Sequence, residues 1–426
     1  MSWLHRIRAL SMDLTPLKES QDFRLLFSAG TVFYLGGMIT YVAIPYQLYT
    51  LTGSNAAVGL VGLVELFPLI VFGLYGGALA DHVDRRKLLI ACGLSQAVLT
   101  ALLALNAFQD QPRVWPLYVI SFFLAAAQSM QRPSKEALLP RTVEHDQLVA
   151  ANALDSFGMQ AGVLVGPAIG GLMLAHVGAD WCYLVDVVAL LVASVLFAAM
   201  ASYPHRDETT PPSLAGIGEG LRNAFSRRDL LGTYLVDIAA MLLAIPVVLF
   251  PALAEDIFRR PELLGLLYSA ETVGALLATA TSGWTSRIRH HGRAIVIAAA
   301  CYGLFIGLAG LAPTIWLAMA GFALAGAADM ISAVFRSTVW SQTIPEAMRG
   351  RLAGIEMLSY SLGPLGGQVR AGFVADLWTV RGSIASGGFA CVAGVGVTAV
   401  VLRDFWRYDA RTDEHARAEK LRRSGA

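Results

Sequence analysis

Apolar runs of membrane length, separated by short polar or charged segments, fill most of this chain. Hydrophobic residues make up 56% of the 426 positions and charged residues only 15%, and the mean hydropathy is +0.57. A soluble domain usually carries about 25% charged residues, and a helix that crosses a bilayer needs about 20 apolar residues. The sequence therefore predicts an all-α membrane protein.

Twelve of the runs are long enough to cross a bilayer. They cover residues 23–49, 56–80, 88–108, 115–132, 149–176, 181–201, 229–253, 262–285, 294–312, 314–338, 351–376 and 383–402. The first run is too long for the core of a signal peptide, so we expect it to be retained as a helix. The segment 202–228 is the longest polar stretch between runs and contains Pro211–Pro212, which is typical of a linker.

The distribution of lysine and arginine predicts the topology. If the N-terminus is cytoplasmic, the inner segments hold 25 of the 32 Lys and Arg residues, whereas the outer loops hold four. Basic residues are enriched in cytoplasmic loops, so we expect both termini in the cytoplasm. The net charge of +1 gives no indication of nucleic acid as a partner.

The two halves of the chain resemble one another. Matching residues recur at an offset of 206 and later at an offset of 201: Pro45 and Pro251, Glu65 and Glu271, Gly77 and Gly283, Thr142 and Thr343, Asp155 and Glu356. We therefore expect two six-helix pseudo-repeats, with an N-terminal half at 1–201, a cytoplasmic linker at 202–228, a C-terminal half at 229–402 and a cytoplasmic tail at 403–426. Parallel repeats of this kind place a substrate site near mid-membrane between the halves.

A charged loop is expected between the second and third runs. From Gly77 to Leu89 the chain follows the pattern G-x-L-A-D-x-x-x-R-R-x-x-L, which resembles the loop between helices 2 and 3 of the major facilitator superfamily of transporters. The resemblance implies the twelve-helix major facilitator fold and a gating loop built on Gly77, Asp81, Arg85 and Arg86. A solvated loop without a gating role is the alternative.

The same loop departs from the common form of that family at two positions. His82 stands where Arg is usual, and Asp84 where Gly is usual. Asp155 and Glu356 lie near the cytoplasmic ends of the fifth and eleventh runs. They are the expected gate partners of Arg85, Arg86 or Arg349.

Small residues surround a proline in the fifth run, at Gly162, Gly166, Pro167, Gly170 and Gly171. Glycines allow close helix contact, and proline removes one helical hydrogen bond. The purely structural interpretation is a tight helix interface. The spacing also resembles the motif typical of exporters in the superfamily.

Three further segments, 132–140, 148–154 and 342–351, are similar to the branch of that superfamily that contains the enterobactin exporter and Tap-type multidrug pumps. The resemblance implies a bacterial protein of the cytoplasmic membrane.

Carboxylates within the runs are the candidate proton-coupling groups, because an ionised side chain inside a bilayer costs several kcal/mol. The candidates are Glu65, Asp237, Glu271, Asp186 and Asp329. A structural ion pair, such as Asp329 with Arg336 or with a neighbouring helix, is the alternative for any one of them. The candidate substrate-lining residues are Tyr34, Tyr41, Phe67, Arg336 and Tyr360, although an aromatic side chain on a spanning helix more often faces lipid or another helix.

No enzymatic motif is present: the chain has no phosphate-binding G-x-x-x-x-G-K-[ST] loop, no H-E-x-x-H and no G-x-S-x-G. The four cysteines lie in apolar runs without metal-ligand spacing, so we expect no metal and no cofactor. The expected function is a monomeric, proton-coupled exporter that moves an amphipathic small molecule, such as a siderophore or a drug, across the lipid bilayer. The alternatives are a multidrug pump without a siderophore role, a nutrient importer or uniporter, and a receptor that does not transport.

Overall fold

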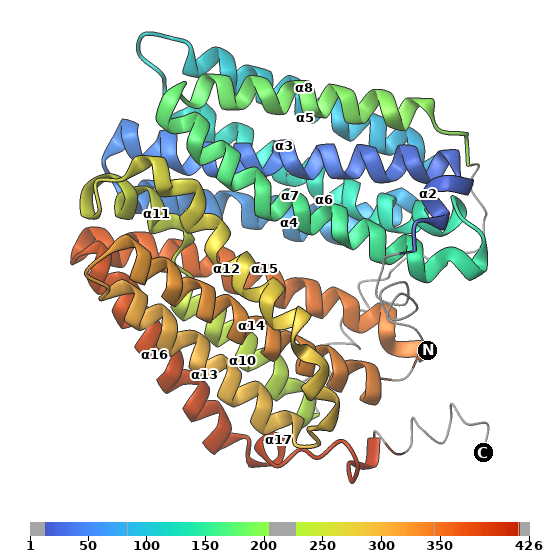
Figure 1. The fold of residues 1–426 in the computed structure, drawn as a ribbon, viewed down its shortest axis with the longest axis vertical. Coiled ribbons are helices and arrows are strands. Elements are labelled where there is room, and N and C mark those ends of the chain that lie inside the picture. The colour runs from blue at the N-terminus through green and yellow to red at the C-terminus, as the bar shows by residue number, and fades with distance from the viewer. Residues whose placement is uncertain (1–12, 83, 204–226, 345, 416, 418–426) are drawn as a thin grey trace, which may run out of the picture. The chain divides into compact units, whose positions relative to one another are not determined.

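The computed structural model describes residues 13–82, 84–203, 227–344, 346–415 and 417, and for residues 73–82, 228–229 and 346–360 it describes the backbone alone. All regular secondary structure in these residues is helical (Figure 1). By their contacts the described residues form two compact units, one within Met1–Ile44 and Val71–Pro211 and the other within Pro45–Ile70 and Pro212–Ala426. The two long helices α3 and α4 therefore contribute residues to both units, a division that sequence inspection did not anticipate.

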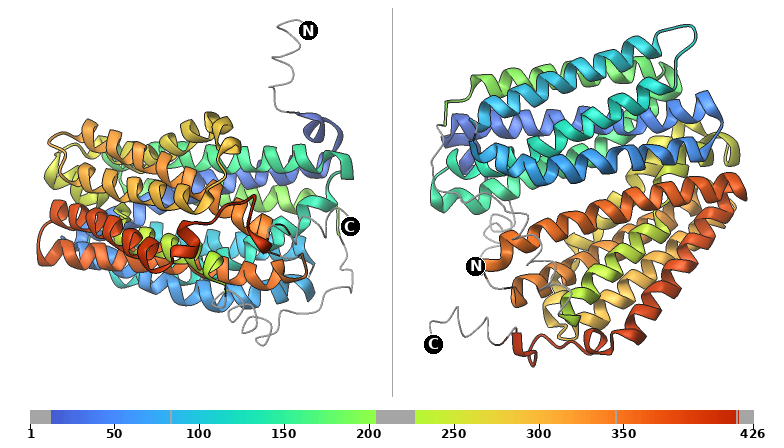
Figure 2. Two further views of the ribbon diagram at one scale, coloured as in Figure 1. Left: turned by 90° about the horizontal axis from the view of Figure 1, so that it is seen from below. Right: turned by 180° about the vertical axis from the view of Figure 1, so that it is seen from behind.

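Besides the short 3₁₀ helices η1 (Leu139–Arg141) and η2 (His145–Gln147), the described residues of the first unit form seven α-helices, two of which it shares with the second unit. They are α2 (Thr15–Glu19), α3 (Gln21–Thr52, to residue 44), α4 (Asn55–His82, from residue 71), α5 (Arg85–Ala107), α6 (Trp115–Leu138), α7 (Leu148–His176) and α8 (Ala179–Ala199). Helices α5 and α8 lie side by side along their length (Figures 1 and 2). A buried apolar cluster, with Phe23, Leu89, Leu154 and Phe197 at its centre, joins α3, α5, α7 and α8.

Glycines bring α7 against α3. A Cβ atom added at Gly162 would lie 2.8 Å from the Cβ of Tyr34, and one at Gly166 would lie 2.5 Å from the Cβ of Met38. A Cβ at Gly170 would lie 3.2 Å from the Cα of Ile39. The glycine motif therefore makes a tight helix interface, and α7 continues through Pro167 without a break.

The second unit holds the remaining helices together with residues 45–70. They are α10 (Arg228–Ala244), η3 (Val247–Leu249), α11 (Phe250–Ala252), the π-helix η4 (Leu253–Ile257), η5 (Pro261–Leu263), α12 (Leu264–Ala280), η6 (Ser282–Arg287), α13 (His291–Gly310), α14 (Ile315–Thr343), α15 (Glu346–Leu377), α16 (Val380–Val401) and α17 (Arg403–Trp406). Helix α13 packs against both α14 and α16, and α14 also packs against α12.

One apolar run is not a single helix. Residues 229–253 were expected to form one continuous span, but α10 ends at Ala244 and the chain continues through short η3, α11 and η4 turns. Proline at positions 246 and 251 accounts for the break, because its ring removes a backbone donor and clashes with the preceding turn.

The charged segments are more helical than expected. The sequence predicted a loop at residues 81–87, but α4 continues to His82 and α5 begins at Arg85. Likewise α6 extends six residues past the predicted end of the fourth run, to Leu138. Most other boundaries agree within three residues; α7 and α8, for example, were predicted at 149–176 and 181–201.

Ten helical segments in the described part of the chain are long and apolar enough to cross a membrane. The other two long helices, α6 and α15, carry more charged and polar side chains, including Lys135 in α6 and Arg370 in α15.

The chain after α16 folds back onto helices α10 and α13 of the same unit. The Phe405 side chain is fully buried there, and the Asp409 carboxylate accepts a hydrogen bond from the backbone N–H of Arg411 at 3.0 Å. Asp409 also lies 3.5 Å from His290 and 3.8 Å from Arg289. The Arg411 N–H, followed by the two basic side chains, lowers the pKa of Asp409 below its usual value. The start of the predicted tail is therefore attached to the α13 end.

The α3–α7 interface predicts how small residues affect stability. Gly166→Ala should reduce the free energy of unfolding by about 1–3 kcal/mol, the usual cost of overpacking a filled interior, because its Cβ has no room beside Met38. Gly37→Ala is the matched control, since a Cβ at Gly37 meets nothing within 4 Å. Thermal unfolding of the purified protein in detergent measures both. Equal stability of the two variants would contradict the tight interface.

Candidate functional site

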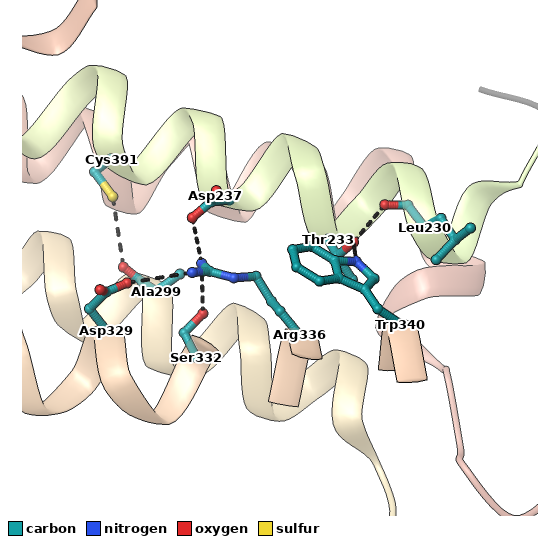
Figure 3. Close-up of polar contacts among 9 residues, drawn as sticks. All are labelled: Leu230, Thr233, Asp237, Ala299, Asp329, Ser332, Arg336, Trp340 and Cys391. Atoms are coloured by element: carbon teal, nitrogen blue, oxygen red, sulfur yellow. Dashed lines mark hydrogen bonds and ion pairs between the residues drawn. The ribbon is translucent and has the colours of Figure 1, made fainter. Parts of the chain in front are cut away.

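A buried arginine joins helices α10 and α14. The Nη1 atom of Arg336 on α14 lies 2.8 Å from Oδ1 of Asp237 on α10, and its Nη2 atom lies 3.8 Å from Oδ1 of Asp329 (Figure 3). Arg336 Nη1 also lies 3.3 Å from the Ser332 hydroxyl. The side chains of Arg336 and Asp237 are 3% and 1% exposed, whereas that of Asp329 is 34% exposed. Asp329 thus lies at the more open side of this cluster.

The spacing along each helix explains the arrangement. Asp329, Ser332 and Arg336 are three and four residues apart, so they share one face of α14. Removing one member of a buried ion pair strands the other, which is strongly destabilising. The α10–α14 contact therefore requires both Asp237 and Arg336 or neither.

A second polar contact lies one turn away from this pair on both helices. The indole N–H of Trp340 donates to the Thr233 hydroxyl at 2.8 Å, and that hydroxyl donates to the Leu230 carbonyl at 2.7 Å (Figure 3). The rings of Tyr234 and Trp340 stack with centroids 5.3 Å apart. These contacts fix the register of α10 against α14 and so position Asp237 opposite Arg336.

Glu271 approaches the same region from α12. A Cβ atom at Gly326 of α14 would clash with the Glu271 backbone carbonyl, so only glycine permits this approach. The Oε1 atom of Glu271 is buried and has no hydrogen-bond partner among the described residues. Gly326 lies one turn before Asp329 on α14, so the Glu271 backbone packs on α14 close to Asp329. Three of the five predicted proton-coupling acids, Asp237, Glu271 and Asp329, are therefore brought together.

The other two predicted acids lie elsewhere. Asp186 on α8 is buried in the first unit, where its Oδ2 accepts a hydrogen bond from the Thr40 hydroxyl at 2.5 Å. Its Oδ1 has no hydrogen-bond partner in the described part of the chain. Glu65 is half-buried on α4 in the second unit, and none of the ion pairs between described residues includes it. Their coupling roles stay predictions.

The loop arginines bind helix ends. Arg85 donates to the Ala137 carbonyl of α6 at 3.2 Å, and Arg86 donates to the Phe197 carbonyl of α8 at 3.1 Å and to that of Ala198. Cations near the C-termini of helices are favourable because the last carbonyls lack helical partners. Asp84 caps α5 by accepting from the N–H of Arg86 at 3.0 Å.

Asp155 has a partner that sequence inspection missed. Lys135 of α6 lies 2.6 Å from the Asp155 carboxylate of α7, whereas Arg85, Arg86 or Arg349 were the partners expected. Lys135 was overlooked because its segment read as a loop rather than as a helix; its ammonium also lies 5.3 Å from the centre of the Tyr34 ring. The side chains of Gly77, Asp81, Arg349, Glu356 and Tyr360 lie outside the described residues.

The predicted substrate-lining residues are distributed over both units. Tyr34 and Tyr41 belong to the first unit, and Phe67 and Arg336 belong to the second. Tyr41 and Phe67 are exposed, at 40% and 62%, while Arg336 is occupied by its acids. A lining role for these residues stays a prediction.

Many long apolar helices with charged side chains buried between them define a multi-pass membrane protein. Residues 11–423 match the model of one family, described as transmembrane secretion effector. The chain belongs to this family, which is part of the major facilitator superfamily.

Curated relatives match over nearly the whole length. The enterobactin exporter EntS of Shigella boydii serotype 18 is 26% identical over 401 residues, covering 94% of each chain. EntS of Escherichia coli O139:H28 is 25% identical with the same coverage.

Solved transporters share the fold. A bacterial homologue of the human lysosomal transporter Spinster, in an inward-facing and unoccupied conformation, aligns with a TM-score of 0.69 at 15% identity and covers 90% of this chain and 95% of its own. The nucleoside transporter NupG aligns at 0.69 and 13% identity, covering 90% and 98%. The POT family transporter PepTSo aligns at 0.70 and 14% identity, covering 92% and 99%. At these identities the likeness shows the fold alone.

The buried ion pair predicts non-additive mutations. Asp237→Asn should reduce the free energy of unfolding by about 3–5 kcal/mol, because it leaves the Arg336 cation without a full counter-charge. Adding Arg336→Gln should then cost much less than Arg336→Gln alone. The exposed pair Arg132–Glu136 is the control, where a coupling of about 0–1 kcal/mol is expected. Thermal unfolding of the four proteins of each cycle tests this, and additive losses at Asp237 and Arg336 would contradict it.

Proposed function

We propose that the protein is a proton-coupled exporter that moves an amphipathic small molecule out of a bacterial cell by alternating access. The observation that carries the proposal is the buried Arg336, held by Asp237 from α10 and by Asp329 from its own helix. Ionisable side chains buried between membrane-spanning helices are a common element of proton relays in transporters.

The cluster supplies a physical route from proton binding to helix movement. A proton that binds a carboxylate of this cluster removes its negative charge and weakens its attraction for Arg336. The guanidinium then favours the acid that remains ionised. Because Asp237 belongs to α10 and Asp329 to α14, a transfer of Arg336 between them changes the force that holds the two helices together.

Glu271 extends this route. Its buried Oε1 has no hydrogen-bond partner among the described residues, and its backbone packs on Gly326, one turn before Asp329 on α14. Only one proton is needed to relieve the repulsion between two neighbouring carboxylates. We infer that Glu271 and Asp329 share a proton that is released when substrate is loaded.

Substrate class and topology come from the relatives and from the charges. The curated relatives are named enterobactin exporters, so a catecholate siderophore is the first candidate substrate, and a drug-like compound is the second. The proposed arrangement is twelve spans, with α6 and α15 added to the ten apolar segments, and with both termini in the cytoplasm of a bacterium. The protein is proposed to work as a monomer.

The topology predicts the behaviour of reporter fusions. A fluorescent protein that matures only in the cytoplasm should be bright when fused after residue 426 or in place of residues 206–220, since both segments are proposed to be inside. Alkaline phosphatase, which is active only outside, should be active when inserted at Gln111 between α5 and α6. Active phosphatase at the C-terminus would contradict an even number of spans.

The function predicts how acid substitutions affect efflux. In a bacterium lacking its own pumps, the chain should lower the accumulation of a catecholate siderophore, and an uncoupler should abolish that effect. Glu65→Gln combined with Asp237→Asn should remove the uncoupler-sensitive efflux, because neutral side chains cannot exchange protons at these positions. Glu136→Gln, an exposed acid on α6, is the matched control. The amount of folded protein in the membrane is measured for each variant, because Asp237→Asn is also expected to destabilise the protein.

The same assay separates the alternatives. Cationic dyes and macrolides test a multidrug pump without a siderophore role, and transport direction in inverted vesicles tests an importer. Efflux that stays fully proton-coupled in the double variant would exclude Glu65 and Asp237 as the carriers.

A further inference from the structure

One carboxylate near the end of α15 binds the first turn of α4. Oδ1 of Asp376 accepts hydrogen bonds from the backbone N–H of Asn55 at 2.9 Å and from the Asn55 side-chain amide at 3.0 Å. Oδ2 accepts from the backbone N–H of Ala56 at 3.0 Å and from the Ser54 hydroxyl at 2.5 Å. Asp376 therefore satisfies the start of a helix that lies more than 300 residues earlier in the chain.

The contact suits the chemistry of a helix start. The first N–H groups of a helix have no partner within it, and its dipole favours a negative charge there. Ser54 also acts locally, because its hydroxyl oxygen accepts from the N–H of Ala57 at 3.1 Å. The first turn of α4 therefore has a local cap of its own, and Asp376 adds an attachment to α15.

The last turns of α3 make two similar contacts. The hydroxyl of Tyr46 donates to Glu255 at 2.8 Å, and the hydroxyl of Tyr49, one turn later, donates to Asp256. Both acids belong to the π-helix η4. In the described part of the chain, Asp376, Glu255 and Asp256 take part in no ion pair, so separating these contacts strands no buried cation.

Glycines bring the helix backbones together behind these bonds. A Cβ atom at Gly59 would lie 2.6 Å from the Gln368 carbonyl, and one at Gly62 would lie 2.7 Å from the Leu365 carbonyl. A Cβ at Gly372 would clash with the Asn55 carbonyl. Asn55, Gly59 and Gly62 of α4 thus face Gly372, Gln368 and Leu365 of α15 in that order. The two helices therefore pack antiparallel over about two turns.

All these contacts lie within the second compact unit, to which residues 45–70 belong. The part of α3 before residue 45 and the part of α4 after residue 70, however, belong to the first unit. We propose that Asp376, with the Tyr46–Glu255 and Tyr49–Asp256 contacts, is a latch that closes the transport path at the outer membrane face. This location at the outer face rests on the proposed function, in which the α3–α4 and α15–α16 connections face away from the cytoplasm.

The latch has a functional consequence. Release of a substrate to the outside requires that α3 and α4 separate from α15 and η4. The hydrogen bonds that Asp376, Glu255 and Asp256 accept from α3 and from the start of α4 must then break. The strength of these bonds sets the fraction of molecules that are open to the outside. Asp376 is a positioning residue in this scheme, since it acts on helices and not on the substrate.

Cysteine accessibility tests the latch without any substrate or proton gradient. The half-buried Gln368 side chain packs against Gly62 in the α4–α15 contact, so the thiol introduced by Gln368→Cys becomes more accessible when these helices separate. A membrane-impermeant, cationic thiol reagent is added to intact spheroplasts or to inverted vesicles. Each labelling rate is compared with that of the same protein without the Gln368→Cys substitution, which corrects for the four native cysteines.

In the Gln368→Cys background, Asp376→Ala should make labelling of the introduced thiol from the outside about tenfold faster, the factor that corresponds to about 1.4 kcal/mol. Tyr46→Phe should act in the same direction and keeps the ring for packing. Glu262→Gln is the control, because it removes an exposed acid of η5 whose carboxylate pairs with Arg260 at 3.3 Å. Size-exclusion profiles show which variants are folded, and Asp376→Asn replaces Asp376→Ala if the latter is not.

An unchanged outside rate in folded Asp376 and Tyr46 variants would overturn the latch. Faster labelling only in inverted vesicles would place the contact at the cytoplasmic face and would also overturn it. Because neither readout involves efflux, a failed latch leaves the proton-coupling proposal intact, and a protein that exports nothing can still show the latch.

Discussion

A guanidinium that is out of contact with water must keep a carboxylate beside it, and the second unit is organised around this constraint. Arg336 is almost fully buried and lies 2.8 Å from Asp237. The cost of stranding either charge exceeds that of most single contacts in a protein. The Trp340–Thr233 hydrogen bond and the Tyr234–Trp340 stack hold α10 and α14 in the one register that allows the pair.

The first unit depends on a different constraint, which is that glycines, without side chains, occupy the contact between α7 and α3. Gly162, Gly166 and Gly170 allow α7 to pack directly on α3, and close packing replaces the hydrophobic driving force that is missing between helices in lipid. Charges in this unit lie mostly at helix ends, where Arg85 and Arg86 bind free carbonyls and Lys135 pairs with Asp155. In the family motif, Arg85 and Arg86 therefore bind the ends of α6 and α8. The gating role of this motif stays a prediction.

Much of the helical architecture could be predicted from the sequence, because a membrane-spanning helix requires a run of about 20 apolar residues, which is visible in the sequence. The predicted ends of α7 and α8 differ from the observed ends by at most two residues. Three features were not predictable in this way. Helix α6 continues to Leu138 because charged residues such as Lys135 are tolerated when they pair, the run at 229–253 breaks at Pro246 although it stays apolar, and residues 45–70 group with the later helices.

The candidate acids could be listed from the sequence, but the contacts that each acid makes could not be predicted. Spacing alone placed Asp329 within reach of Arg336, and the structure confirms that contact at 3.8 Å. The closer partner, Asp237, lies nearly 100 residues away in sequence, and only the rotation of α10 about its axis decides that it faces α14. Lys135, Ser332 and Thr40 were missed because single polar residues on helices carry no pattern that distinguishes a partner from a solvated side chain.

The most direct test of the central claim is a proton flux measured in proteoliposomes that contain the purified protein, with the membrane voltage clamped to zero. A catecholate siderophore is loaded inside and an internal dye reports pH. If the Arg336 cluster exchanges protons for substrate, outward movement of the siderophore must acidify the interior, and Asp237→Asn must abolish the acidification. Siderophore efflux without any change of internal pH would contradict the account.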